Sequence, residues 1–244
     1  MRLVTYRTVE TEPRLGLLHD GLIIDVACFG DAIGHDLPST MLDFIDLGPI
    51  GVRFLREAVE SATTADLVGT SLPEGNATLL APIPRPRKNV FGIGLNYIDH
   101  VAESAQALDT SPDLPKQPVI FSKPPTSVIA PGDPIVHRAD ITRQLDWEIE
   151  LGCIIGTTAR RVRREDALAH VFGYTTLIDM SARDCRRAGQ WIYSKGQDTY
   201  APFGPVIVTA DEIPDPQSLD LWLTVNGVEK QRSNTAKMLF KVDE

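Results

Sequence analysis

Acidic and apolar residues alternate along the segment LDWEIEL, residues 145–151, which is the period of a β-strand with one polar face. Its polar positions are Asp146, Glu148 and Glu150. Residues two apart on a strand are separated by roughly 6.5–7 Å, so neighbouring carboxylates can converge on one cation, whereas Asp146 and Glu150 hardly can. Such a row of acids is also the ordinary solvated face of a strand, so the rest of the sequence must decide.

One acid, Asp179, interrupts the β-branched and apolar segment GYTTLIDMS, residues 173–181. A carboxylate in a buried strand is unfavourable unless it is paired, protonated or bound to a metal. Together with Glu148 and Glu150 it would form a hard, all-oxygen site suited to Mg²⁺ or Mn²⁺. The first chemical hypothesis is therefore a divalent metal site between two strands.

His100 and Glu103 are three residues apart in a stretch, about 98–108, that has the pattern of a helix. At this spacing the two side chains share one helix face and can meet. A carboxylate that is hydrogen-bonded to an imidazole fixes its tautomer and raises its basicity, as a general base for water activation requires. A surface ion pair is the alternative interpretation of the same spacing.

Positive charge gathers downstream of Asp179, at Arg183, Arg186 and Lys195. The chain as a whole is acidic, with 24 Lys and Arg against 33 Asp and Glu and a net charge of -9. This balance argues against a general binder of nucleic acid or of anionic membranes. A small anionic ligand would need cations gathered locally, as they are here; for Arg186, a solvated basic helix is the alternative.

The chain divides into two parts that must position these residues. Residues 1–80 have the pattern of a small N-terminal α+β domain. Prolines alternate with basic residues in 81–88, which makes this segment a stiff linker that can be neither helix nor central strand. Residues 89–244 then carry all the candidate chemistry.

Several local elements can be predicted from turn and cap chemistry. Short strands near 2–6, 15–18 and 22–26 should form an antiparallel meander, and Ser39 or Thr40 should cap a helix that runs through residue 45. A short helix near 164–171 should join the two acidic strands. Asn226-Gly227 indicates a type I′ hairpin.

The composition is that of an ordinary soluble globular protein, with 43% hydrophobic and 23% charged residues. The three cysteines, Cys28, Cys153 and Cys185, are widely spaced and form no CxxC motif, so they indicate neither a disulfide framework nor a zinc site. The N-terminus has no apolar signal region, and no apolar run approaches the ~18 residues of a membrane span. We therefore expect a cytoplasmic protein without a membrane partner.

Six stretches, in this order and spacing, closely resemble the fumarylacetoacetate hydrolase family. They are GIGLNYIDHVAES at 92–104, PVIFSKPPTSVIAPGDPI at 118–135, LDWEIELGCIIG at 145–156, GYTTLIDMSARD at 173–184, SKGQDTYAPFGPVIVT at 194–209 and VNGVEKQRSNTAKMLF at 225–240. The resemblance covers nearly everything after the proline linker, and the N-terminal module is similar to the small domain of many bacterial members.

The resemblance implies a mixed β-sandwich or β-roll catalytic core, a bound Mg²⁺ or Mn²⁺ and a homodimer. By position, Glu148, Glu150 and Asp179 match the metal ligands, and Asp146 matches an acidic position just outside them. His100 and Glu103 match the acid/base pair on a lid that orders over substrate. Lys195 matches the lysine that faces substrate and metal. We assign substrate binding to four further positions, Asn96, Tyr97, Arg183 and Arg186.

Two departures from the family pattern stand out. Many members have glutamine where this chain has Arg186, which could pair with an extra substrate carboxylate or point away. The chain stops at Glu244, before the PGD turn and the Gly-Thr-Pro segment with which other members continue. We therefore expect a truncated or split form, or a site completed differently.

The function that this resemblance implies is Mg²⁺- or Mn²⁺-dependent hydrolysis of a carbon–carbon bond in an acylpyruvate-type β-diketo acid, a small anionic 2-oxo acid. The products would be pyruvate and a carboxylic acid. Two alternatives stay open. The same metal-enolate site could decarboxylate a 2-oxo acid or isomerise a hydroxymuconate-type diene, and the chain could be a non-catalytic remnant that still binds metal.

Overall fold

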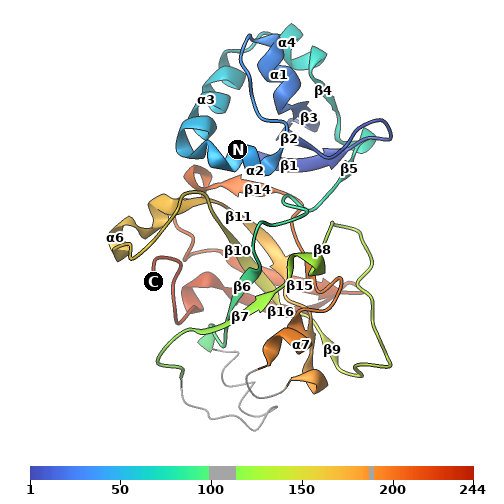
Figure 1. The fold of residues 1–244 in the computed structure, drawn as a ribbon, viewed down its shortest axis with the longest axis vertical. Helices are drawn as coiled ribbons and strands as arrows, with labels where there is room; N and C mark the ends of the chain where they lie inside the picture. Colours follow the sequence, from blue (N-terminus) through green and yellow to red (C-terminus); the bar gives the residue numbers. More distant parts are fainter. Residues whose placement is uncertain (99–113, 187–189) are drawn as a thin grey trace.

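The computed structural model describes residues 1–98, 114–186 and 190–244 (Figure 1). The fold is mixed α/β and rich in sheet, as expected. The chain begins in a module of strands and helices drawn in blue and cyan at the top of Figure 1, and the remaining strands lie below it. Within the described ranges, no helix combines the length and apolar character needed to cross a bilayer.

The N-terminal module contains the predicted meander. Its elements are β1 (Arg2–Arg7), β2 (Arg14–His19), β3 (Leu22–Asp25), α1 (Val26–Ala32), α2 (Met41–Asp46), α3 (Gly48–Ser61), α4 (Thr64–Gly69), β4 (Ser71–Pro73) and β5 (Thr78–Leu79). Strands β1, β2 and β3 pair antiparallel in sequence order, which confirms the prediction. Thr40 caps α2, since its side chain accepts a hydrogen bond from the Asp43 amide.

The second part is made of short strands and two described helices. They are β6 (Val90–Gly94), β7 (Val119–Lys123), β8 (Val128–Ile129), β9 (Leu145–Asp146), β10 (Ile149–Ile155), α6 (Arg164–Ala167), β11 (Val171–Ile178), β12 (Ser181–Ala182), α7 (Trp191–Lys195), β13 (Ala201–Pro202), β14 (Ile207–Thr209), β15 (Asp220–Val225) and β16 (Val228–Asn234). The helix expected between the acidic strands is α6, followed by one 3₁₀ turn. Asn226 and Gly227 both have positive φ in the β15–β16 turn, as a type I′ hairpin requires.

One eight-stranded sheet contains strands from both parts of the chain. Its order is β10-β11-β14-β1-β2-β3-β4, with β5 also paired to β1. The junction is the antiparallel pair β1–β14, in which Leu3 lies opposite Ile207. Residues 81–88 contain neither helix nor strand, as predicted. The division into domains at this linker stays a prediction.

The core of the protein follows this shared sheet. Leu3, Phe29, Phe44 and Ile207 are fully buried in one cluster, which also includes Phe172 of β11. The rings of Phe44 and Phe172 meet edge to face with centroids 6.3 Å apart. Apolar packing therefore ties helix α2 of the N-terminal module to the strand that leads into the candidate site.

The acidic segment 145–151 forms two strands and not the single strand that its alternation predicts. β9 pairs with β12, placing Asp146 opposite Ser181, whereas β10 pairs with β11. Glu148 lies in the break between β9 and β10. Because the chain changes partner there, one predicted strand becomes two, and pairing with different strands is not visible in local sequence.

A buried charge pair closes one end of the N-terminal meander. Asp25, which is 6% exposed, caps α1 by accepting a hydrogen bond of 2.9 Å from the Cys28 amide. The hydroxyl of Tyr6 donates to it at 2.6 Å, and Arg14 binds it through two nitrogens. Burial alone would raise the pKa of Asp25, but these hydrogen bonds, that of Arg14 first, lower it to about 2.

We expect Asp25→Asn to destabilise the protein by about 2 kcal/mol at neutral pH, which is the linkage equivalent of that pKa shift. The folded-state pKa lies below the ordinary value of 3.8. The stabilisation is therefore present above about pH 4 and is lost as the pH falls toward 2. Urea unfolding of wild type and variant at pH 7 and pH 3 checks this. An equal stability difference at both pH values would contradict it.

Candidate active site

Glu148 and Asp179 are brought together by the β10–β11 ladder. Ile149 lies opposite Ile178, so the residues just outside the pair, Glu148 and Asp179, lie at the same end of the two strands. The Asp179 amide donates to the Glu148 carbonyl at 2.7 Å. The two residues are 9% and 3% exposed. The solvated-face interpretation of Glu148 is therefore wrong.

Lys195, the last residue of α7, joins these two carboxylates. Its ammonium donates to Glu148 Oε2 at 2.7 Å, to Asp179 Oδ2 at 2.5 Å and to Ser181 Oγ at 2.8 Å. The ammonium also lies 4.7 Å from the centre of the Phe121 ring. All three of its N–H donors have partners within the site, so this cation has a fixed position.

Glu150 approaches the same cluster from β10. Burial raises its pKa to about 8, with further contributions from Glu148 and Asp179 and an opposing one from Lys195. In the part of the chain that the structure describes, its carboxylate makes no hydrogen bond or ion pair. Glu150 is thus an acid held among other acids without a bonded cation of its own.

Lys123, at the end of β7, was not identified from the sequence. Its ammonium lies 2.7 Å from Asp179 Oδ1, and its side chain is almost fully buried. Burial lowers its pKa to about 8, against the opposing effect of Asp179. Burial likewise raises the pKa of Asp179, although Lys123 and Lys195 oppose that rise. The sequence feature that could have identified Lys123 is its position at the end of the apolar strand VIFSK.

Gln231 is a second residue that the sequence did not single out. From β16, its side-chain carbonyl accepts the Ile149 amide at 2.7 Å, and its amide reaches the Ile149 carbonyl at 3.4 Å. It thereby covers the backbone of edge strand β10 between Glu148 and Glu150. The side-chain amide of Gln231 pairs with the Ile149 backbone as a residue of a neighbouring strand would, because it offers a donor and an acceptor.

The two arginines predicted to bind substrate have different surroundings. Arg183 donates to Asp146 at 2.8 Å and to Glu148 at 2.5 Å, so it holds the acidic residues in place. The guanidinium of Arg186 lies over the Trp191 ring, 4.2 Å from its centre. Burial and the like charge of Arg183 lower the Arg186 pKa. Among the described residues, its side chain has no carboxylate partner.

Asn96 and Tyr97 contact the C-terminal segment of the chain. The Asn96 side chain donates to the Phe240 carbonyl at 2.9 Å and accepts the Phe240 amide at 2.8 Å. Tyr97 forms a β-bridge with Met238. Burial and nearby Glu150 raise the pKa of the Tyr97 hydroxyl, which has no hydrogen-bond partner among the described residues. Their assignment to substrate binding stays a prediction.

His100 and Glu103, the predicted acid/base pair, lie outside the described residues. Their role also stays a prediction.

The carboxylates of Glu148, Glu150 and Asp179 are candidate ligands of a divalent cation. Among the described residues, no three His, Cys, Asp or Glu side chains are spaced to hold an ion, and the Lys195 ammonium bonds to two of these acids. The donor chemistry nevertheless fits Mg²⁺ or Mn²⁺, because all three groups are hard oxygen donors and Glu150 has no competing partner within the described ranges. The donor set is thus compatible with the predicted metal.

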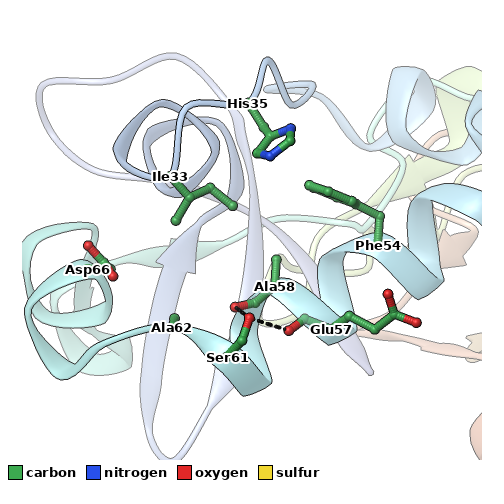
Figure 2. A pocket seen from close by; sticks show the side chains of 8 residues that line it. All are labelled: Ile33, His35, Phe54, Glu57, Ala58, Ser61, Ala62 and Asp66. Carbon is green, nitrogen blue, oxygen red and sulfur yellow. Dashed lines mark hydrogen bonds between the residues drawn. The ribbon is translucent and has the colours of Figure 1, made fainter.

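A pocket of about 350 Å³ lies elsewhere, between α1, α3 and α4 of the N-terminal module (Figure 2). His35 and Phe54 meet at its wall with ring centroids 4.7 Å apart. Its polar groups Ser61 and Asp66 are engaged locally, with helix carbonyls and with Thr63. We assign no chemistry to this pocket.

Comparison with known proteins gives consistent matches. Residues 89–244 match the family described as fumarylacetoacetate (FAA) hydrolase C-terminal. The whole chain is 38% identical to oxaloacetate tautomerase fahd2, mitochondrial, of Xenopus laevis and spans 72% of that protein.

Solved structures resemble the whole chain as well. Maleylpyruvate hydrolase from Sphingobium sp. SYK-6, in complex with manganese(II) ion and pyruvate, is 31% identical, with a TM-score of 0.74 and 80% of that chain covered. A 5-carboxymethyl-2-hydroxymuconate delta-isomerase from Mycobacterium smegmatis is 31% identical, with a TM-score of 0.71 and 79% covered. The relatives thus include a tautomerase, a hydrolase and an isomerase.

Proposed function

Because the chain belongs to the fumarylacetoacetate hydrolase family, whose members are enzymes, we propose that it catalyses keto–enol interconversion of a small 2-oxo dicarboxylic acid such as oxaloacetate. The observation that carries the proposal is the Lys195 ammonium held between Glu148 and Asp179. An enol forms when a proton leaves the carbon next to the 2-oxo group and another arrives at the oxo oxygen. A fixed ammonium stabilises the negative charge that develops there.

The residues of the chain take separate roles in this proposal. Glu148, Glu150 and Asp179 would hold Mg²⁺ or Mn²⁺, which when bound supplies a Lewis acid for the 2-oxo and carboxylate oxygens. The positive charge of the Lys195 ammonium would stabilise the enolate oxygen electrostatically. His100, oriented by Glu103, is proposed to take the proton from carbon.

Hydrolysis of an acylpyruvate to pyruvate and a carboxylic acid is the second candidate. The solved maleylpyruvate hydrolase with manganese and pyruvate favours it. It needs the same enolate as leaving group and, in addition, a water activated by a base. We place it second because the relative named as a tautomerase is 38% identical to this chain, against 31% for the hydrolase.

Product analysis with added Mn²⁺ distinguishes the candidates. Fresh enol-oxaloacetate should convert to the keto form faster than in buffer, without loss of carbon. Pyruvate plus a second acid from an acylpyruvate would indicate hydrolysis, and carbon dioxide would indicate decarboxylation. Binding of Mn²⁺ with no turnover of any 2-oxo acid would contradict the proposal and support a non-catalytic metal-binding protein.

We expect Arg186→Ala to raise the KM for a 2-oxo dicarboxylic acid by about 10- to 100-fold, the equivalent of one charged hydrogen bond. Its guanidinium is half-buried, lies over Trp191 and has no carboxylate partner in the described chain, so it can pair with a second substrate carboxylate. Steady-state kinetics on paired mono- and dicarboxylic substrates checks this. Arg186→Lys, the matched control, should retain part of the preference, and an equal loss for both substrate types would contradict the role.

A further inference from the structure

Lys123 is the most completely buried cation near the candidate site. Its residue is 1% exposed, and its ammonium is surrounded by oxygen atoms. It lies 2.7 Å from Asp179 Oδ1 and donates to the carbonyls of Met180 at 3.0 Å, Tyr200 at 2.9 Å and Lys195. These four oxygen atoms, one in an ion pair and three as hydrogen-bond acceptors, belong to three chain segments: the residues that follow β11, the end of α7 and the approach to β13.

Burying an ammonium is costly unless it is paired and hydrogen-bonded, and an apolar side chain of similar length could fill the same space. The four oxygen partners offset the cost for Lys123. Because the residues that follow β11, the end of α7 and the segment before β13 all bind the same ammonium, their positions relative to one another are fixed. An apolar side chain would not fix these segments in this way, because it offers no hydrogen bonds to them.

Two of those partners belong to the candidate chemistry. Lys123 contacts Oδ1 of Asp179, while Lys195 takes Oδ2 at 2.5 Å. Lys123 also donates to the main-chain carbonyl of Lys195, the residue whose ammonium reaches Glu148. One buried cation thus orients a carboxylate and anchors the backbone of the lysine that bonds to it.

We propose that Lys123 is a positioning residue, which fixes Asp179 and Lys195 relative to each other so that Oδ2 and the Lys195 ammonium face Glu148. The role in catalysis rests on the proposed function. The positioning itself does not, because it concerns contacts present in the protein alone.

Lys123→Met preserves the length of the side chain and removes its charge and its donors. We expect Mn²⁺ affinity to fall about 10- to 100-fold, as when groups that orient metal ligands are removed. We expect kcat on enol-oxaloacetate to fall about 100-fold with a smaller change in KM, as for a misplaced catalytic group. Isothermal titration with Mn²⁺ and steady-state kinetics measure the two effects.

Thr5→Val is the matched control for a general loss of stability. Thr5 is buried in β1 and donates to the Pro82 carbonyl at 2.6 Å, so the variant also loses one buried hydrogen bond, in the N-terminal module. Its Mn²⁺ affinity and kcat should stay within about twofold of wild type, since distant sites act independently. If Lys123→Met fails to fold, Lys123→Gln keeps polar donors at the position and should show the same ordering of effects.

Hydrogen exchange separates this inference from the proposed function. In Lys123→Met, without metal, the amides of residues 178–182 and 191–200 should exchange faster than in wild type, while the β15–β16 hairpin stays unchanged. Acceleration confined to those segments supports positioning even if wild type turns over no 2-oxo acid, an outcome that rejects the proposed function alone. Unchanged exchange there, or exchange raised equally throughout the chain, would overturn the assignment.

Discussion

Replacing Lys195 with methionine is expected to lower kcat on a 2-oxo acid substrate by about 10²- to 10³-fold, the usual effect of removing one donor that stabilises a developing oxyanion. The methionine side chain fills similar space but carries no positive charge and offers no N–H group to Glu148 or Asp179. Substrate binding should change less, because the lost interaction strengthens as the enolate forms. Steady-state kinetics of wild type, Lys195→Met and the exposed-residue control Lys88→Met measures this effect.

The same substitution should also destabilise the metal-free protein. Removing one partner of a buried ion pair costs about 3–5 kcal/mol. We expect the lower end of that range, because Lys123 still contacts Asp179 and Arg183 still contacts Glu148. Urea unfolding without metal measures the loss, and added Mn²⁺ should restore part of it by supplying positive charge. A variant that keeps kcat within threefold while losing stability would show a structural role alone.

Local patterns, together with the family resemblance, singled out Glu148, Asp179 and Lys195, which the structure brings together. The alternation around Glu148 and Glu150 and the lone acid Asp179 suggested oxygen ligands, a role that stays a prediction. The meander, the Thr40 cap and the Asn226 turn were also predicted, since each depends on neighbours a few residues away. Features set by short-range chemistry were therefore accessible from the sequence.

Features set by long-range contacts were not. The change of partner at Glu148 depends on β11 and β12, which lie further along the chain. Lys123 reaches carbonyls 57 to 77 residues away, so no local spacing marks it as part of the site. Gln231 meets Ile149 over 82 residues. Sequence spacing contains no information on such pairs until the strand order is known.

Arg183 and Arg186 differ in their surroundings in a way that charge alone does not predict, and the assignment of both to substrate binding stays a prediction. As a cation downstream of Asp179, Arg183 was expected to bind an anionic substrate. In the structure it is bonded to Asp146 and Glu148, which leaves its charge already neutralised. Arg186, three residues later, has no such partner among the described residues and retains the capacity to bind a carboxylate. The structure therefore separates two arginines that the sequence could not.

Glu150 provides the sharpest distinction between a metal site and a purely ionic cluster. We expect Glu150→Gln to lower Mn²⁺ affinity by about 100-fold or more, and kcat with it, because a neutral amide replaces one of three carboxylate ligands. Isothermal titration measures the affinity, and the exposed-residue control Glu165→Gln should leave it unchanged. A cluster held together by ion pairs alone would show no such loss, since Glu150 makes none in the described chain.

The same variant should be more stable than wild type when metal is absent. Glu150 is held near Glu148 and Asp179 without a bonded cation among the described residues, and its pKa of about 8 reflects that cost. Glutamine removes the charge, so we expect a gain of about 1–3 kcal/mol in urea unfolding at pH 8 with a chelator present. Mn²⁺ should then stabilise wild type and not the variant. Higher metal-free stability together with lower Mn²⁺ affinity in the variant would show that the Glu150 carboxylate serves metal binding. A loss of metal-free stability would show instead that this carboxylate has a structural partner.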